Sequence, residues 1–325
     1  MKICFTQLTL KLFLIFEIIS FGVHCENYKF PTITKPNGAI NSKCSLQDDK
    51  FPCIRITIHS SIARYHYVSQ KYKLHACTIN KAFSSMMVSI LCLLYDKKRF
   101  FKIHRHLNED DWNNLACSNE NLITSIPESA KLFANEENEK KYKHIMVVRN
   151  PIARLISSYT HLCIKSKNVS GREKTCFNSN GNIQIFLERL YESLTNEMKF
   201  GGGEVNVHRR NHFHPSVWNC DYVKYKKYYT IIKYSSKHPK QFYRNLMSVL
   251  RKQNIPKHEL AYIRREISGP RNAHATYKDG VRWEQTKIIW KSPYLLDLIS
   301  RIYFEDFMQF GYKLPNLEAF KKMQL

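Results

Sequence analysis

Two segments of the chain share one order of elements: a short apolar strand, a tight polar loop and an amphipathic helix. In the first segment, residues 73–79 predict a buried strand and Ser84 opens the helix. In the second, residues 143–148 predict the strand, and Pro151 occupies the first helical position, where proline is favoured. Apolar side chains at helical spacing mark the two helices: Met87, Ile90, Leu91 and Leu94 in the first, and Ile152, Leu155, Ile156 and Tyr159 in the second.

The rest of the chain continues the alternation of strands and helices. Asn182 predicts the cap of a helix, and residues 228–234 predict another buried strand. Helices are predicted at 241–252 and at 292–306, the second with Ser292 as its cap. This alternation predicts an α/β fold with a central parallel sheet flanked by helices. Ligands of such sheets bind at the carboxyl ends of the strands, where both polar loops would lie.

Cationic side chains outnumber anionic ones: 51 Lys and Arg against 27 Asp and Glu give a formal charge of +24. A field of this sign attracts polyanions, which include nucleic acids, anionic membranes, acidic polysaccharides and nucleotides. With 43% hydrophobic and 24% charged residues over 325 positions, the composition is typical of a folded globular chain. It excludes the disordered and collagen-like classes.

Residues 1–25 are predicted to be a signal peptide or an uncleaved signal anchor, since two lysines precede a mostly apolar run at 12–23. The run is short and contains Glu17, which makes it a poor transmembrane span, so membrane anchoring stays an alternative to cleavage. We expect residues 26–60 to form a polar stem and residues 61–325 to form the functional domain.

Eight cysteines remain once the leader is set aside, an even number that suits the oxidising lumen of the secretory pathway. Asn168 begins an N-glycosylation sequence, which favours the same compartment and argues against a nucleic-acid partner. Cys163 with Cys176 and Cys44 with Cys53 are the predicted local disulfides. A zinc site is the alternative, although the spacing matches no compact zinc pattern; its candidate ligands are Cys163, Cys176, His212, His214 and Cys220. We therefore expect no metal.

The first polar loop places Lys81, Ser84 and Ser85 just ahead of a helix. Helix N-termini present free amide groups and the positive end of a dipole, so this combination predicts an anion cradle. The chain has no glycine between Gly38 and Gly171, which excludes a glycine-rich Walker loop here and disfavours a nucleotide kinase. A solvated lysine beside a serine cap is the alternative interpretation.

The second polar loop begins with Arg149 at the end of its predicted strand. Arg154, Ser157 and His161 then fall on the helix face opposite the apolar stripe. A strand-end arginine with a helix serine, beside the lysine and serines of the first loop, predicts two anion sites for one doubly charged ligand. An ordinary solvated polar face is the alternative.

Four stretches of the sequence, CTINKAFSSMM, VVRNPIARLISSY, HFHPSVWNCDYVKYKKYYTIIKY and IYFEDFMQFGY, resemble the Golgi carbohydrate sulfotransferases. The likeness is to the chondroitin 4-O-sulfotransferase-like group and its divergent nematode-type relatives, and it spans about residues 74–314. It implies a P-loop-NTPase-like sulfotransferase fold, a location in the Golgi lumen and the co-substrate 3′-phosphoadenosine 5′-phosphosulfate (PAPS). It also departs from the family pattern, because Asn80 stands where relatives usually have proline before the lysine.

The resemblance also implies roles for residues of both loops. Lys81, Ser84 and Ser85 match the loop that holds the 5′-phosphosulfate, and Arg149 and Ser157 match the pair that holds the 3′-phosphate. Sulfuryl transfer then depends on positioning and on charge stabilisation, with the lysine neutralising charge on the bridging oxygen of the leaving nucleotide.

A base must take the proton of the acceptor hydroxyl, and histidine is the commonest type near neutral pH. The candidates are His104 and His106 after the first helix, and His212 and His214 in the third stretch. We favour His212 because its stretch belongs to the resemblance.

Residues 201–270 hold 14 Lys or Arg against 4 Asp or Glu, with tyrosines interleaved at 222, 225, 228, 229 and 234. Such a surface suits an anionic glycan acceptor, with residues 211–240 as its expected binding segment. The sequence therefore favours a carbohydrate sulfotransferase. The alternative is a catalytically silent, secreted glycan-binding or heparin-binding protein on the same fold, which would have no reason to keep Lys81, Arg149 and Ser157 together.

Overall fold

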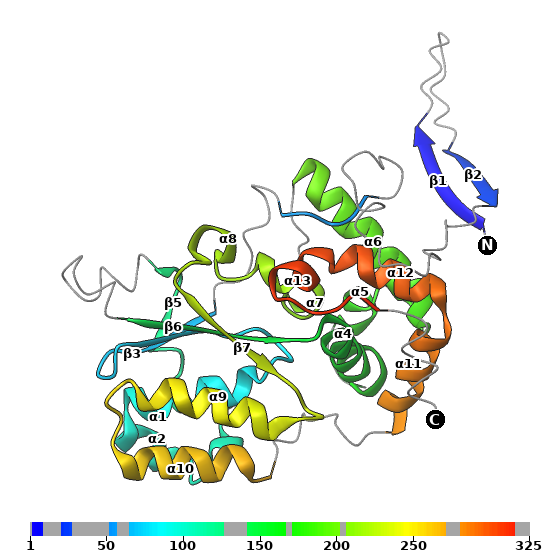
Figure 1. The fold of residues 1–325 in the computed structure, drawn as a ribbon. Helices are drawn as coiled ribbons and strands as arrows, with labels where there is room; N and C mark the ends of the chain where they lie inside the picture. The colour runs from blue at the N-terminus through cyan, green and yellow to red at the C-terminus, as the bar shows by residue number, and fades with distance from the viewer. Residues whose placement is uncertain are drawn as a thin grey trace, which may run out of the picture.

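A computed structural model of the chain describes residues 2–8, 21–27, 52–56, 65–126, 142–166, 171–201, 206–270 and 280–315. A five-stranded sheet in the order β5-β3-β4-β6-β7 lies at the centre of the fold (Figure 1). Its strands are β3 (His66–Ser69), β4 (Leu74–Cys77), β5 (Leu122–Ile123), β6 (Lys143–Arg149) and β7 (Tyr229–Tyr234). The α/β prediction is confirmed, and all three predicted strands are present, as β4, β6 and β7.

The sheet is mixed. Strands β4, β6 and β7 are parallel, as predicted, but β3 pairs antiparallel with both β4 and β5. The reason is the short connection between Ser69 and Leu74, because a tight turn joins neighbouring strands only in the antiparallel sense. Lys73 closes this turn with a φ of 47°.

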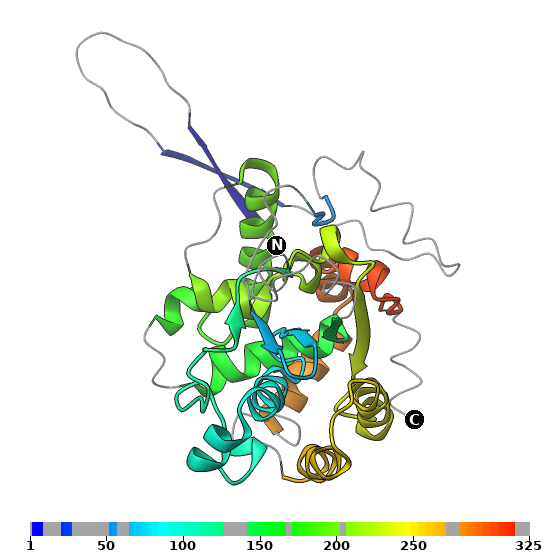
Figure 2. The same ribbon diagram turned by 90° about the vertical axis from the view of Figure 1, so that its left-hand side faces the viewer.

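Helices cover both faces of the sheet (Figures 1 and 2). One face packs against α1 (Ser84–Tyr95), α9 (Pro239–Arg251) and α10 (Lys257–Ser268), and the other against α4 (Pro151–Tyr159), α6 (Ile183–Phe200) and α12 (Pro293–Ile302). Alternate side chains of β6 enter the two cores, Ile145 and Val147 on one side and Met146 and Val148 on the other. An apolar strand buried on both faces is typical of a parallel sheet between helical layers. The remaining helices are α2 (Lys97–Ile103), η2 (Leu107–Glu109), η4 (Thr160–Lys165), α5 (Arg172–Thr175), α7 (Val207–Phe213), η5 (Ser216–Trp218), α8 (Tyr222–Tyr225), α11 (Gly280–Lys291) and α13 (Phe304–Gln309).

Side-chain caps mark three of the predicted helix starts, those of α4, α6 and α12. The side chain of Asn150 accepts the amide of Ala153, with Pro151 at the first helical position of α4. Asn182 and Ser292 cap α6 and α12 in the same way.

The helix predicted at 292–306 is two helices, α12 and α13. The break falls at Tyr303, whose hydroxyl donates to the carbonyl of Phe213 at 2.7 Å. The new helix direction lets the Asp306 carboxylate accept the amides of Ser216 and Val217. Buried tertiary contacts therefore determine where α12 ends, and these contacts cannot be predicted from the spacing of apolar residues in the sequence.

Three disulfides join described cysteines: Cys77–Cys220, Cys92–Cys117 and the predicted Cys163–Cys176. They remove three of the candidate zinc ligands, because Cys163, Cys176 and Cys220 are not thiolates in this structure. Cys53 is also disulfide-bonded. The predicted partner Cys44 and the glycosylation acceptor Asn168 lie outside the described residues.

A separate two-stranded sheet forms where β1 (Lys2–Leu8) pairs antiparallel with β2 (Phe21–Asn27), and it lies apart from the main sheet in Figure 2. Among the described residues, no helix has the length and apolar character needed to cross a membrane. The boundaries of the leader, stem and functional domain stay predictions.

Three buried histidines form a chain across neighbouring strands of the main sheet. His66 Nδ1 lies 2.8 Å from His75 Nε2, and His75 Nδ1 lies 2.9 Å from His144 Nδ1. Burial and the two neighbouring rings lower the pKa of His75 well below its usual value, so this ring is neutral.

Candidate active site

A cleft of about 520 Å³ opens at the carboxyl ends of β4, β6 and β7. Both loops singled out from the sequence border it, as the strand-end rule for parallel sheets predicts. The structure gathers all six predicted site residues around this cleft: Lys81, Ser84, Ser85, Arg149, Ser157 and His212. The two pairs of adjacent parallel strands bring the two loops together, because the strand ends meet at one edge of the sheet, and α7 (Val207–Phe213) adds His212.

The loop after β4 turns sharply without a glycine. Lys81 and Phe83 both adopt left-handed backbone conformations, with φ values of 65° and 69°. This conformation costs free energy at a residue with a side chain, and it persists only where the surrounding structure holds it in place. Phe83 precedes α1 and makes no side-chain capping hydrogen bond. The first amides of α1 therefore face the cleft region without a side-chain cap, beside Ser84 and Ser85.

Lys81 has an unusual electrostatic setting. Its Nζ lies 2.7 Å from Nδ1 of His161, which follows α4 in the π-helical turn η4. Burial, together with the positive charge of Arg149, lowers the pKa of the Lys81 ammonium to about 7. The cleft therefore holds a lysine whose charge is poised near neutral pH, as expected of a group that meets an anion.

Arg149 ties the ends of the strands together. Its Nη1 donates to the carbonyl oxygen of Lys81 at 2.8 Å, and its Nη2 donates to Ser236 Oγ at 3.2 Å. The β6–β7 register pairs Arg149 with Tyr234, and the guanidinium carbon lies 5.3 Å from that ring centre. Buried Ser157 on α4 lines the same cleft. The arginine and both loops thus belong to one site.

His212 presents one ring nitrogen toward Asn80. Its Nδ1 lies 2.8 Å from the carbonyl of His208, and because a carbonyl only accepts, this nitrogen carries the proton. In the neutral ring, Nε2 is therefore the basic nitrogen, and it lies 3.4 Å from Asn80 Nδ2. Burial, and then the charge of Lys81, hold the pKa of His212 well below its usual value. The ring is thus neutral and keeps an acceptor lone pair.

The sequence profile of the sulfotransferase family matches residues 64–313. The chain belongs to the sulfotransferase family. It is 30% identical to the carbohydrate sulfotransferase chst-1 of Caenorhabditis elegans over 251 residues, which cover 77% of this chain and 75% of that protein. It is 27% identical to the putative sulfotransferase vep-2 of the same organism over 211 residues, which cover 64% of each protein. No solved structure matches the chain.

The other candidate bases of this sulfotransferase lie away from the cleft. His104 is buried, with Nε2 2.9 Å from the carbonyl of Asn114. His106 lies at the surface, where it pairs with Glu266 at 3.1 Å. His214 is buried 3.6 Å from Glu197, and burial lowers its pKa to about 3.

Arg154 does not line the cleft, unlike Ser157 and His161, with which the sequence grouped it on one helix face. It is fully buried and donates to the carbonyls of Asn80 at 3.1 Å and His214 at 2.9 Å. These bonds tie the first loop of the sulfotransferase to the segment after α7. Arg154 therefore supports the cleft from behind and does not line it.

The basic, tyrosine-rich segment does not form one surface, which corrects the expectation from the sequence. Its tyrosines divide between the two ends of β7, a strand that rises roughly 17 Å from Tyr229 to Tyr234. Tyr234 lines the cleft, whereas Tyr228 is exposed at the opposite end and Tyr222 is buried. Strand β7 runs through the segment, so residues that are close in the sequence lie at opposite ends of the strand.

Several residues that line the cleft of this sulfotransferase have no individual role predicted from the sequence, although Asn211 and Ser236 fall within the expected acceptor-binding segment 211–240. Ser236 follows β7, so the strand-end rule that found the other two loops also applies to it. The sequence predicts that His161 shares a helix face with Ser157, but it does not predict the contact between His161 and Lys81. Tyr65 and Trp112 carry no local signal, because only the tertiary fold brings them to the cleft.

Proposed function

We propose that this sulfotransferase moves the sulfuryl group of PAPS to a hydroxyl of a chondroitin-like glycosaminoglycan. The observation that carries the proposal is the meeting of Lys81, Arg149 and neutral His212 in one cleft at the ends of parallel strands. The name of the relative chst-1 supports a carbohydrate as the acceptor. The compartment we propose is the Golgi lumen, and the disulfides suit its oxidising environment.

In this proposal, the donor lies across the two loops. Lys81, Ser84 and Ser85 bind the 5′-phosphosulfate with the uncapped amides of α1, and Arg149 and Ser157 bind the 3′-phosphate. The lowered pKa of Lys81 fits such a ligand, because an anion nearby restores the charge that burial disfavours. The residues present thus suit a nucleotide with anionic groups at both ends of its ribose.

The proposed reaction is an in-line displacement at sulfur. The acceptor hydroxyl oxygen forms a bond to sulfur, and the bond from sulfur to the bridging phosphate oxygen breaks. His212 Nε2 takes the hydroxyl proton, since its Nδ1 is already protonated toward His208. Lys81 stabilises the negative charge that develops on the bridging oxygen. The products are the sulfated glycan and 3′-phosphoadenosine 5′-phosphate (PAP).

Transfer of radiolabelled sulfate from PAPS to a panel of glycans tests the proposal directly. We expect transfer to chondroitin, weakened by added salt because the acceptor is anionic. His212→Ala should reduce the rate by roughly 10²–10⁴-fold and leave PAP binding intact. His258→Ala is the matched control, since it removes a surface histidine that lies outside the cleft and is not a candidate base.

Two results would contradict the proposed roles. Transfer retained in His212→Ala and lost in His104→Ala or His106→Ala would move the base to the segment after α2. Equal, salt-insensitive transfer to a neutral glycan would exclude an anionic acceptor. Binding of glycan and PAP without any transfer would favour the catalytically silent alternative.

A further inference from the structure

One wall of the cleft carries an aromatic pair, exposed Trp112 and half-buried Tyr65, that the donor does not account for. Trp112 is 38% exposed and lines the cleft beside Asn113. The ring of Tyr65 packs against it, with ring centres 6.1 Å apart and planes inclined by 59°. A tryptophan left open to solvent inside a cleft is typical of a binding surface.

The aromatic pair lies on the side of His212. Asn211 Nδ2 donates to the Tyr65 hydroxyl at 2.8 Å, and Asn211 directly precedes His212 on α7. A second aromatic group lies beside Arg149, where the Phe83 ring centre is 5.4 Å from that of Tyr234. The arginine side is where the nucleotide is placed, so the pair at Trp112 is left for the acceptor.

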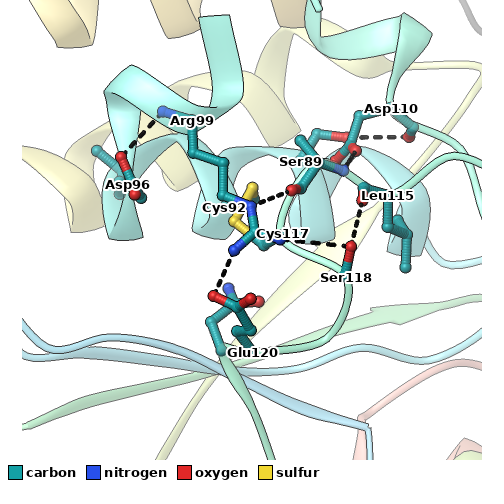
Figure 3. The surroundings of a disulfide bond; sticks show 12 residues. Ser89, Cys92, Asp96, Arg99, Asp110, Leu115, Cys117, Ser118 and Glu120 are labelled. Atoms are coloured by element: carbon teal, nitrogen blue, oxygen red, sulfur yellow. Dashed lines mark hydrogen bonds and ion pairs between the residues drawn. A yellow bond between two sulfur atoms is a disulfide. The ribbon is translucent and has the colours of Figure 1, made fainter. Parts of the chain in front are cut away.

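The segment that presents Trp112 is fixed at both ends (Figure 3). At one end, Asp110 accepts the amide of Ala116 through its carboxylate at 2.7 Å, and its carbonyl accepts Ser89 Oγ at 3.3 Å. At the other end, the Cys92–Cys117 disulfide joins the segment to α1. A surface that is already ordered loses little entropy when it binds a ligand.

His104 holds the same segment from inside. Its Nε2 lies 2.9 Å from the carbonyl of Asn114, two residues after Trp112. This contact gives buried His104 a structural role, since it takes no part in the proposed proton transfer. It helps to hold the segment that carries Trp112.

We propose that Trp112, with Tyr65, is a stacking platform for a pyranose ring of the glycan acceptor, on the His212 side of the cleft. The inference rests on the proposed function. The C–H face of a sugar packs well on an aromatic face, whose π electrons make it negative. The amides of Asn113 and Asn211 lie beside the platform and suit the sugar hydroxyls. The competing occupant is the adenine of the nucleotide, which also stacks on aromatic rings.

Calorimetric binding of an unsulfated chondroitin hexasaccharide, with PAP present, tests the platform without requiring turnover. We expect Trp112→Ala to weaken hexasaccharide binding by roughly tenfold, the scale of a lost aromatic stacking contact. Trp112→Phe should restore most of that loss, and PAP affinity should stay unchanged in both variants. Trp283→Ala is the matched control, because Trp283 is exposed on α11 and lies outside the cleft lining.

A second variant keeps the test independent of any folding defect at Trp112. Asn113 is exposed, so Asn113→Asp is tolerated, and its new carboxylate should repel the uronates of the hexasaccharide at low salt. We expect severalfold weaker hexasaccharide binding, with unchanged PAP binding. Unchanged hexasaccharide affinity in this variant would argue against an acceptor at this wall.

The outcomes separate the platform from the proposed function. Equal hexasaccharide affinity in Trp112→Ala and the wild type overturns the platform alone. A wild type that does not bind the hexasaccharide overturns both the platform and the chondroitin-like acceptor of the proposed function. A loss of PAP affinity in Trp112→Ala overturns the platform as well, by assigning the wall to adenine. Wild-type protein that binds both ligands at the expected sites but transfers no sulfate overturns the proposed function and leaves the platform in place.

Discussion

Lys81 supplies cationic charge to the cleft, and its surroundings work against that charge. Burial and the neighbouring Arg149 lower its pKa to about 7, and the Nζ contact to His161 holds the side chain in place. A buried cation beside another cation is costly to the folded protein unless an anion arrives. An anionic ligand would therefore relieve the free-energy cost of burying the charged Lys81 side chain next to Arg149.

Proton uptake on nucleotide binding should measure how far the nucleotide raises the pKa of Lys81. Above pH 7 the Lys81 amine is largely neutral in the free protein, and the anionic nucleotide raises its pKa. We expect PAP binding at pH 8 to take up a proton and to weaken as pH rises from 6 to 8. Calorimetry in buffers of different ionisation enthalpy measures the uptake. Lys81→Met should abolish it, and uptake that persists in this variant would place the titrating group elsewhere.

Arg149 is the second residue whose replacement should lower the affinity for PAP. Arg149→Ala is expected to weaken PAP binding by about 1.5–3 kcal/mol, the scale of a hydrogen bond to a charged group. Arg149→Lys keeps the charge but loses the planar contacts to the Lys81 carbonyl and Ser236, so it should recover only part of the affinity. PAP titrations of the three proteins measure the difference. Unchanged affinity in Arg149→Ala would remove this residue from the site.

At the scale of elements, local signals predicted those parts of the fold that local chemistry determines. Apolar strands, proline at a first helical position and one asparagine cap mark β4, β6, α4 and α6 where the structure has them. Strand β3 was missed because its pairing depends on a turn and on partners elsewhere in the chain. The two loops of the site were found because each follows a recognisable strand. Trp112 was not, because its place depends on a disulfide and buried hydrogen bonds.

Two helix caps allow a matched test of how an element positions the site. Asn150 caps α4 between Arg149 and Ser157, whereas Asn182 caps α6, which takes no part in lining the cleft. Either change to alanine should cost about 1 kcal/mol of folding stability. Asn150→Ala should also weaken PAP binding, because it loosens the start of the helix that carries Ser157. Urea denaturation and PAP titration together check this; equal PAP affinity in both variants would show that the cap is only structural.

At the scale of the whole molecule, the sheet is held between two helical cores, and one disulfide ties it to a segment far away in sequence. Cys77 ends β4 just before the Lys81 loop and is bonded to Cys220, 143 residues later. The Cys163–Cys176 disulfide spans only 13 residues. Because a long disulfide removes more freedom from the unfolded chain than a short one, these two bonds should contribute unequally to stability.

Replacing both cysteines of each pair by serine should therefore give different losses. On the chain-entropy scale, the Cys163 and Cys176 double variant should lose about 3 kcal/mol of unfolding free energy, and the Cys77 and Cys220 double variant about 5 kcal/mol. The second variant should also bind PAP more weakly, since Cys77 fixes the strand end that leads into the Lys81 loop. Urea denaturation measured under oxidising conditions, which keep the Cys92–Cys117 bond intact in both variants, gives the comparison. Equal losses would mean that native contacts around the sulfur atoms, and not freedom in the unfolded chain, determine what each disulfide contributes.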